Sequence, residues 1–531
     1  MVVPFVYDLD VSGGSDYNSL SIFHFYLQMC IENNLPLISH ERYFQKSSEF
    51  LNDSGYCNFL KSIDVDISLL LSDENNKINK YAIAQEVDDK IISSYPSQMT
   101  CWQDLLQKPN AVFENEIIKL ISKIELDFGE KIEAFLCFYC TASLRKVANE
   151  KGITIIFNER SSFRPEMFIS TGYFDLKDCY GYGELEDRYK NFIKNDEISK
   201  FYFDRKEILA LFMTANGLNY LPLINEVKPV YELGICRPSY HGSIIKDGVF
   251  CPGELDRDAH KFYSNGQIKY RERTDPETAL EFILSCKRIA SVHSNMSFDV
   301  MLLGRTSCSY GQSPFAFMAN NGIQDIKENI APIGFINFVV FGYFVPWQLI
   351  RNVDYIKWRL SKPSEIEIYN KHLDFYLEQR GLTRELFKQH KDVRLEYILK
   401  NQNVKPFDLR NRMFKLENNN FLINGIDENN IRKLFKEGIS FGPYWELPCG
   451  NYSLKIAGEN LSAAEFNVYY CKGQKHVDFV KIVDSSLVEL KFTVEEKISD
   501  IEFVIRNKSE NGISIYSIEL SGSEKRLRNE N

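Results

Sequence analysis

Short apolar runs alternate with helical patterns over roughly the first 330 residues, and this alternation constrains the fold more than any other feature of the sequence. An apolar run at residues 2–7 ends in a polar, glycine-bearing turn, and a helical pattern follows over 17–33. The same rhythm returns at 132–157 and again between about 205 and 330. Strands that alternate with helices form parallel sheets. The sequence therefore predicts an α/β chain with two Rossmann-like halves and a ligand cleft at the carboxyl ends of their strands.

The pattern changes twice after residue 350. Residues 355–435 are charged and helical in pattern, whereas short alternating runs separated by turn residues recur from 439 to 520. The second pattern is typical of a small β-sandwich. We therefore expect a Rossmann-like acceptor domain at 1–200, a Rossmann-like donor domain at 201–350, a helical connector packing back on the core at 351–438, and a carbohydrate-binding-like β-sandwich at 439–522.

Charge and cysteine content narrow the class of protein. Lys and Arg number 63 against 73 Asp and Glu, a formal net charge of −10, so there is no basic field to attract nucleic acid. The 12 cysteines are scattered, which favours reduced thiols in a cytoplasm. The start of the chain lacks the pattern of a secretory signal. Residues 330–350 are apolar, but Pro332, Gly334, Asn337, Gly342 and Pro346 interrupt them. We therefore expect a buried segment there and a cytoplasmic protein, with peripheral contact at the inner face of the inner membrane left open.

The turn after the first predicted strand carries Asp8, Asp10 and Ser12. The two aspartates match the Asp-x-Asp pattern of haloacid-dehalogenase-type phosphatases, in which one carboxylate attacks phosphorus and the other transfers protons. That reaction also needs a lysine and a magnesium-binding acidic pair, which the sequence does not place. The alternative is that these aspartates cap a strand-to-helix turn at the cleft.

Two later segments bring polar groups to predicted strand ends. In 152–165 a strand delivers Glu159 and Arg164, an acid and a guanidinium suited to proton transfer and anion binding; a surface ion pair is the alternative. In 289–317 a strand runs into Ser294, Asn295 and Ser297, where serine hydroxyls, the asparagine amide and the helix-start N–H groups can hold a phosphate. Two histidines also fall at predicted strand ends, where ligand contact and structural packing are equally expected, namely His241 and His293.

These segments resemble a known family. Glu159-x-x-x-x-Arg164-Pro165 resembles the Glu-x-Gly-x-x-Arg-Pro segment of bacterial Kdo transferases, the retaining β-Kdo enzymes of capsule-linker and O-antigen-terminating type. Ser294-Asn-Met-Ser-Phe-Asp-Val-Met-Leu-Leu-Gly304, followed by Tyr-Gly, resembles their Ser-x-x-Gly-Phe-Glu-Ala-Leu-Leu-x-Gly and Tyr-Gly motifs. Cys236-Arg237-Pro238 stands in the place of their Lys-Pro-His-Pro strand end. The motifs follow in the same order over residues 125–320.

The resemblance implies a GT-B glycosyltransferase that moves 3-deoxy-D-manno-oct-2-ulosonic acid (Kdo) from CMP-Kdo to a bacterial surface polysaccharide, such as a capsule or lipopolysaccharide O antigen, or its lipid-linked precursor. It implies retention of configuration and no metal or other cofactor. Glu159 would act as acid or base beside the sugar. The residues that would hold the donor are Arg237, His241, His293, Ser294, Asn295 and Ser297.

The sequence departs from the family at the nucleophile. The family carries Gln-x-x-x-Asp on a strand feeding the cleft, and here residues 211–216, expected to continue a strand from Ile208, place Asn216 at the aspartate. An amide is a far weaker nucleophile than a carboxylate. Three interpretations are open. Residue 216 has been altered to trap a complex, another carboxylate such as Asp204 or Glu232 is the nucleophile, or the reaction is not a double displacement.

Other functions stay open at this point. One is a transferase for another CMP-linked acidic sugar, and a second is a non-catalytic glycan-binding protein on a decayed transferase scaffold, which the missing aspartate favours. A magnesium phosphatase built on Asp8 and Asp10 is a third. In the predicted β-sandwich, Tyr444 and Trp445 are candidates for stacking on sugar rings, although an aromatic residue at a strand entrance is more often part of the core.

Overall fold

The computed structural model divides the chain into two compact units, Met1–Val404 and Lys405–Asn531. The residues that it describes are 1–9, 17–72, 75, 78–164, 167–178, 183–194, 202–218, 220–222, 224, 227–237, 254–271, 278–292, 294–311, 313–324, 328–385, 394–400, 411–414, 416, 421–447, 449–471, 473–484, 486–495 and 498–524. Each unit has its own hydrophobic core. We therefore describe the two units separately.

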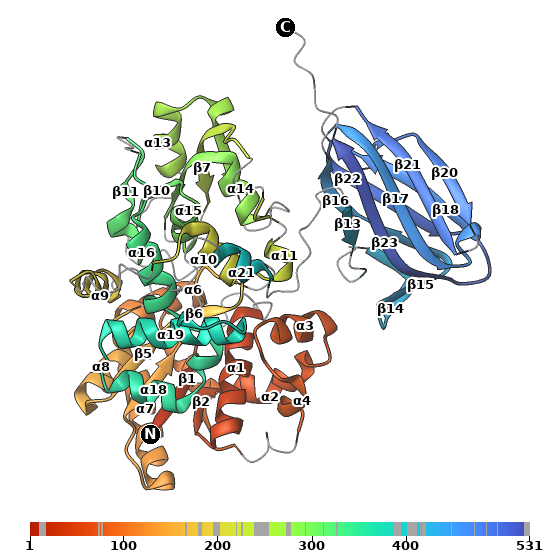
Figure 1. Cartoon of the computed structure of the whole chain (residues 1–531). Helices are drawn as coiled ribbons and strands as arrows, with labels where there is room; N and C mark the ends of the chain where they lie inside the picture. The colour runs from red at the N-terminus through yellow and green to blue at the C-terminus, as the bar shows by residue number, and fades with distance from the viewer. Residues whose placement is uncertain are drawn as a thin grey trace. The chain divides into compact units, whose positions relative to one another are not determined.

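A five-stranded parallel sheet in the order β3-β2-β1-β4-β5 forms the start of the first unit (Figure 1). Its strands are β1 (Val2–Val6), β2 (Leu37–His40), β3 (Lys80–Ile83), β4 (Ala134–Cys137) and β5 (Thr154–Phe157). The helices of this region are α1 (Tyr17–Asn33), α2 (Glu41–Phe50), α3 (Ser54–Ser62), α4 (Ile67–Leu70), α5 (Gln85–Ile92), α6 (Gln98–Gln107), α7 (Ala111–Phe128) and α8 (Ala142–Lys151). Alternate side chains of β1 enter two different cores, with Val3 and Phe5 in one and Val2 and Val6 in the other. Both faces of the sheet are therefore covered, as the continuous apolar run of β1 predicts.

Local signals set the helix between β4 and β5. Thr141 caps the start of α8 by accepting a hydrogen bond from the Leu144 N–H, and the helix ends at Gly152 with φ 69°. A side-chain cap at the start and a left-handed glycine at the end are the expected boundaries of a helix. Because β5 begins two residues later, these signals also place the end of β5, from which Glu159 follows.

A second five-stranded parallel sheet has the order β11-β10-β9-β7-β8. Its strands are β7 (Tyr231–Cys236), β8 (Ile268–Arg271), β9 (Cys286–Ser291), β10 (Thr306–Ser309) and β11 (Asn320–Asn321). The helices beside it are α13 (Glu254–Phe262), α14 (Ala279–Ser285), α15 (Met296–Leu302) and the 3-10 turns η3 (Asn265–Gln267) and η4 (Ala316–Met318). The expectation of two Rossmann-like parallel sheets is therefore confirmed.

The segment expected to be a strand from Ile208 to Met213 is a helix, α10 (Arg205–Phe212). Asp204 and Glu207 form a capping box that starts it, and residues 208–212 are buried on every side. A helix that is apolar all round shows no period that distinguishes it from a buried strand. The strand prediction for this segment, and with it the strand placed before Asn216, is wrong.

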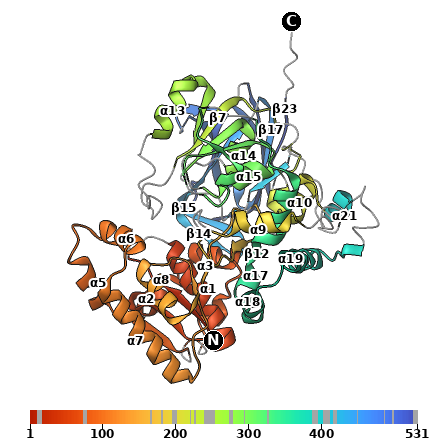
Figure 2. The same ribbon diagram turned by 90° about the vertical axis from the view of Figure 1, so that its left-hand side faces the viewer.

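An antiparallel pair, β6 (Thr171–Tyr173) with β12 (Phe344–Pro346), lies between the two parallel sheets (Figures 1 and 2). Around it are α9 (Leu185–Phe192), α10, α11 (Ala215–Leu218), α16 (Ile333–Phe338), the π-helix η5 (Val339–Tyr343), α17 (Trp347–Ile350), α18 (Val353–Leu360), α19 (Glu365–Gln379) and α21 (Arg394–Lys400). Residues 335–347 are buried in the protein, as we expected of the apolar segment. Among the described residues, no helix has both the length and the apolar character needed to cross a bilayer.

The second unit is an 11-stranded antiparallel sheet that curls around one apolar core. Its strands are β13 (Asn411–Phe414), β14 (Phe421–Glu428), β15 (Ile431–Phe441), β16 (Pro443–Leu447), β17 (Gly450–Glu459), β18 (Ala464–Tyr470), β19 (Lys475–His476), β20 (Phe479–Asp484), β21 (Leu487–Val494), β22 (Ile498–Asn507) and β23 (Ile513–Glu524). Hydrogen bonds join all of them, because β15 pairs with both β22 and β23. The helical pattern expected up to about Phe435 is wrong from β13 onward, since charged residues on the outer face of β14 and β15 imitate a solvated helix.

Candidate active site

The carboxyl end of β5 delivers Asn158, Glu159 and Arg160 to the edge of the first sheet. The Asn158 side chain donates to the carbonyl of Tyr173 at 2.9 Å, and the Tyr26 hydroxyl donates to Asn158 at 3.1 Å. The Glu159 carbonyl accepts the Tyr173 N–H at 2.7 Å. Glu159 is half-buried, and its backbone is held by the β6 strand. The sequence-predicted acid therefore stands on a fixed backbone.

The carboxyl end of β7 delivers Arg237 to the edge of the second sheet. Its guanidinium lies 4.2 Å from the centre of the Tyr270 ring and 3.4 Å from the Asp256 carboxylate. Its backbone N–H donates to the carbonyl of Arg271 at 3.0 Å, which places the end of β8 beside it. Arg237 retains its charge on a partly buried surface, and an arginine in such a position is suited to binding a phosphate.

Ser294 contacts the thiol of Cys236, the last residue of β7, and Arg271 lies beside the same thiol. Burial raises the pKa of Cys236, and the charge of Arg271 and a hydrogen bond with the Ser294 side chain act in the opposite direction. Arg237 follows Cys236 directly in the chain. Arg237 and the turn at Ser294 therefore lie at the same carboxyl edge of the second sheet: the turn contacts Cys236, whereas the Arg237 side chain contacts Tyr270 and Asp256.

The turn at Ser294 is ordered by its own hydroxyls. The Ser294 hydroxyl accepts the Met296 N–H at 3.1 Å, and the Ser297 hydroxyl contacts the Ser291 hydroxyl at 3.1 Å. Ser291 and Ser297 are buried. The helix that follows, α15, has only 7 residues. The polar groups of this turn therefore point mainly into a local network between β9 and α15.

Asn295 connects the turn to the first sheet. Its side-chain oxygen accepts the Tyr173 hydroxyl at 2.7 Å, and its amide N–H donates to the carbonyl of Arg160 at 3.1 Å. Both partners belong to the segments that surround Glu159. The sequence suggested that Asn295 binds the donor, and the structure shows its amide bonded between the two halves of the first unit.

Arg164 is exposed, and its guanidinium donates to the carbonyl of Ser161 at 3.2 Å. It lies near Asp299 of α15, a carboxyl that the sequence motif contained but that we did not single out. Burial raises the pKa of Asp299 to about 7, although a hydrogen bond with Ser162 and the charge of Arg164 act to lower it. Asp299 is thus a carboxyl group that titrates near neutral pH beside the candidate site.

This titration predicts a pH-dependent stability. Between the ordinary value of 3.8 and about 7, the folded chain keeps a proton on Asp299 that the unfolded chain has lost. The free energy of unfolding therefore falls as pH rises through this window, by up to about 4 kcal/mol, and stays low above it. Asp299→Asn is expected to remove this slope and to raise stability at pH 8.

The measurement is urea unfolding at several pH values. Tryptophan fluorescence in a Trp445→Phe background reports on residues 1–404, which hold the other three of the 4 tryptophans. Asp89→Asn, an exposed position on α5, is the control and should leave the slope unchanged. A slope that persists in Asp299→Asn would assign the titration to another group.

Asp8 lies at the carboxyl end of β1. Arg42 contacts its carboxylate, and the Tyr43 hydroxyl donates to the same oxygen at 2.7 Å. Next to it, His40 lies 2.8 Å from the buried Asp88 carboxylate. A guanidinium bound to Asp8 competes with a metal ion for that oxygen, so the arrangement favours a structural or anion-facing role over the phosphatase hypothesis.

Several sequence-predicted residues lie outside the described part of the chain, namely Asp10, Ser12, Pro165, His241 and His293. The backbone of Asn216 lies in α11, and its side chain is not described. The two alternative nucleophiles have structural partners: Asp204 caps α10, and Glu232 pairs with Lys287 at 2.5 Å. The identity of the nucleophile stays a prediction.

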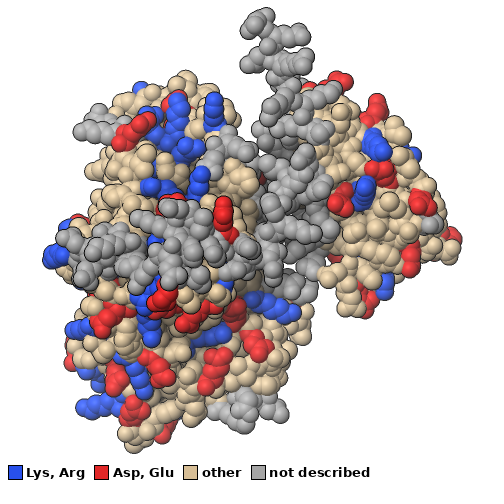
Figure 3. All heavy atoms as spheres, viewed as in Figure 1, with Lys and Arg blue, Asp and Glu red and all other residues tan. Residues whose placement is uncertain are grey.

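Sequence reasoning missed two residues of this arrangement. Arg271 ends β8, and the alternating run Ile-Lys-Tyr-Arg that it closes could have predicted this strand. Tyr173 was missed because no sequence signal links it to Asn295, a residue 122 positions away. Figure 3 shows Lys and Arg side chains grouped where Figure 1 places β7 and α13, whereas acidic and basic side chains mix over the first sheet.

The two candidate sugar-stacking residues belong to β16 of the second unit. Trp445 is half-buried and packs against the apolar core. The Tyr444 hydroxyl donates to Glu502 at 3.3 Å. The contact of Trp445 with the core fits the packing role that we weighed against glycan stacking.

Comparison with known proteins supports the class of the chain. Residues 6–184 match the model of the glycosyltransferase 99 family N-terminal domain. This part of the chain is therefore similar to a glycosyltransferase domain, in line with the expected resemblance to glycosyltransferases. No curated protein matches the chain.

Three solved structures show distant likeness. The β-Kdo 2,4 transferase of KpsC from Thermosulfurimonas dismutans is 12% identical over 42% of this chain and 86% of its own, with a TM-score of 0.27. The β-Kdo 2,7 transferase of the same KpsC is 10% identical over 45% and 90%, also with a TM-score of 0.27. The C-terminal CBM6 of LamC, a marine laminarinase from Zobellia galactanivorans, is 13% identical over 21% and 98%, with a TM-score of 0.18. TM-scores this low support no conclusion about the fold or substrate of this chain.

Proposed function

We propose that this glycosyltransferase transfers Kdo from CMP-Kdo, with retention, onto a bacterial surface polysaccharide or its lipid-linked precursor. The observation that supports the proposal is that Arg237, Arg271 and the Ser294 turn lie at the carboxyl ends of strands of one sheet, and that Asn295 joins this turn to the segment that bears Glu159. Cationic and hydroxyl groups at the carboxyl ends of parallel strands suit a nucleotide phosphate.

Each side chain has a role in this proposal. Arg237 and Arg271 would neutralise the CMP phosphate and stabilise it as a leaving group. The Ser294 turn, supported by Ser297, would position the nucleotide. His241 and His293, which follow predicted strands in the sequence, would also contact it. Glu159 would act as acid or base toward the acceptor hydroxyl. The reaction as proposed uses no metal or other cofactor, and the GT-B arrangement of the two sheets would bring donor and acceptor together.

The place of action is also part of the proposal. A lipid-linked glycan acceptor lies at the cytoplasmic face of the inner membrane, so the protein would work in the cytoplasm with peripheral membrane contact. The net charge of −10 does not oppose this, because donor capture depends on the local arginines. The antiparallel sheet of strands β13 to β23 would contact glycan.

One observation favours a second function. Asn216 stands where the family's nucleophilic aspartate is expected, which suits a glycan-binding protein on a transferase scaffold that no longer turns over. A transferase for another CMP-linked acidic sugar uses the same donor site. Release of CMP from CMP-Kdo by the wild-type chain would dismiss the non-catalytic alternative.

The first test of the donor class is nucleotide-dependent thermal stability. A ligand that binds only the folded state raises its stability by about 2.7 kcal/mol when present at 100 times its Kd. We expect CMP to raise the Tm of the chain by several degrees, and UDP and GDP at the same concentration to leave it unchanged. CDP has the same base as CMP but a diphosphate, so comparing the two Tm shifts separates the contribution of the base from that of the phosphate. A larger shift with UDP than with CMP would overturn the proposed donor.

A further inference from the structure

Tyr173 occupies the junction between the two halves of the first unit. Its side chain is fully buried, and its ring lies between Tyr343 and Phe344, with ring centres 5.2 and 5.6 Å away. Its strand, β6, pairs with β12 on one side. A ring enclosed in this way has little freedom to rotate. The position of its hydroxyl is therefore set by the core of the protein.

The two ends of Tyr173 contact different halves. Its backbone N–H donates to the carbonyl of Glu159 at 2.7 Å, and its hydroxyl donates to the side-chain oxygen of Asn295 at 2.7 Å. The orientation of the Asn295 amide is fixed, because its N–H group faces the carbonyl of Arg160, which can only accept. One residue thus holds the backbone of the candidate acid and, through Asn295, the turn that begins at Ser294.

We infer that Tyr173 is a positioning residue that sets the donor-binding turn relative to Glu159 through its hydroxyl. The inference rests on the proposed function for its effect on the donor, but the link itself is a property of the described contacts. Without the hydroxyl, Asn295 keeps only its bond to Arg160, and the Ser294 turn is no longer tied to the β6 strand. Neither Tyr173 nor Asn295 needs to touch the substrate for this effect.

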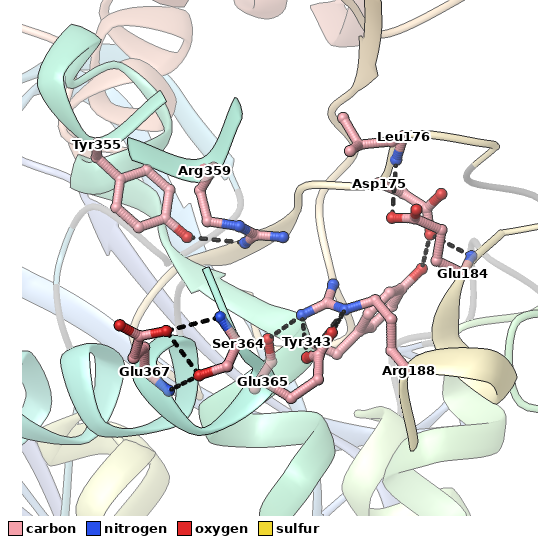
Figure 4. Close-up of polar contacts among 11 residues, drawn as sticks. Asp175, Leu176, Glu184, Arg188, Tyr343, Tyr355, Arg359, Ser364, Glu365 and Glu367 are labelled. Carbon is pink, nitrogen blue, oxygen red and sulfur yellow. Dashed lines mark hydrogen bonds and ion pairs between the residues drawn. The ribbon is translucent and has the colours of Figure 1, made fainter. Parts of the chain in front are cut away.

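Tyr173→Phe tests the link because it removes one oxygen atom and keeps the ring. The matched control is Tyr343→Phe, another fully buried tyrosine, whose hydroxyl donates to Asp175 at 2.8 Å and not to the Ser294 turn (Figure 4). Both variants lose one hydrogen bond of similar length. Any general loss of stability is therefore expected in both, whereas an effect on the turn is expected only in Tyr173→Phe.

The experiment has two readouts on the full chain. Amide hydrogen exchange of residues 294–302 should become at least threefold faster in Tyr173→Phe and stay unchanged in Tyr343→Phe. The Kd for CMP should rise about three- to tenfold in Tyr173→Phe alone, the size expected for one hydrogen bond. In the Asn295→Ala background, Tyr173→Phe should add nothing further, because the acceptor is gone.

The possible results separate this inference from the proposed function. Equal effects of the two tyrosine variants on exchange and on CMP binding would overturn the inference, since a merely structural role predicts equality. If the wild-type chain binds no CMP, the proposed donor is wrong, and hydrogen exchange alone decides the inference. Unchanged exchange of residues 294–302 in Tyr173→Phe then overturns it.

Discussion

Arg237→Met is expected to weaken binding of CMP by roughly 10- to 150-fold, the loss that follows from removing a hydrogen bond to a charged group worth about 1.5–3 kcal/mol. Methionine keeps much of the length and the apolar stem of the arginine, but loses the guanidinium that lies over Tyr270. The measurement is a calorimetric titration of the full chain with CMP. Turnover of CMP-Kdo should fall by at least the same factor, because the phosphate gains charge as it leaves.

The control for this prediction is Arg288→Met. Arg288 lies on β9 of the same sheet, and its guanidinium pairs with Glu232 at 3.3 Å, near the amino end of β7. Like Arg237, it is an arginine paired with a carboxylate, but it lies away from the carboxyl edge of the sheet. We expect its CMP affinity to stay within about twofold of wild type. Equal losses in both variants, or wild-type affinity in Arg237→Met, would place the nucleotide elsewhere.

The sequence predicted the parts of the fold that local signals determine. Residues 17–33 form α1 and residues 154–157 form β5 as expected, because the first run is too long for a strand and the second is a short apolar run that follows Gly152. Glu159 follows β5 and Arg237 follows β7. Both residues are therefore placed at the carboxyl edge of a parallel sheet by topology alone. The segment at α10 failed for a physical reason, since burial on all sides removes the period on which such a prediction depends.

The roles of individual site residues were less predictable. Asn295 reads as a donor-binding group because it follows a strand, yet its partners Arg160 and Tyr173 are 135 and 122 positions away in the chain. Contacts at such separations depend on how the two sheets pack, which no local pattern encodes. The raised pKa of Asp299 is equally non-local, because it comes from burial in the folded chain, and the two groups that act to lower it, Ser162 and Arg164, are distant in the sequence.

The second prediction concerns an ion pair that joins α9 to α19. The Arg188 guanidinium donates to each carboxylate oxygen of Glu365 at 2.9 Å (Figure 4). It also donates to the carbonyl of Gly342 at 2.8 Å. Arg188 is buried. Burial acts against its charge, but Glu365 holds its pKa above the usual value. This pair connects the helices after the second sheet to the segment that follows β6.

Glu365→Gln is therefore expected to lower the free energy of unfolding of residues 1–404 by about 3 kcal/mol, since it removes the charged group that is hydrogen-bonded to a buried guanidinium. Glu367→Gln is the matched control on the same helix. Glu367 accepts from the Ser364 N–H at 2.8 Å as a cap, so glutamine, which also serves at this position, should leave the free energy of unfolding nearly unchanged. Urea unfolding followed by tryptophan fluorescence in the Trp445→Phe background measures both. Similar midpoints for the two variants would mean that Arg188 finds water or another acceptor, and that the ion pair contributes little to holding α19 on the core.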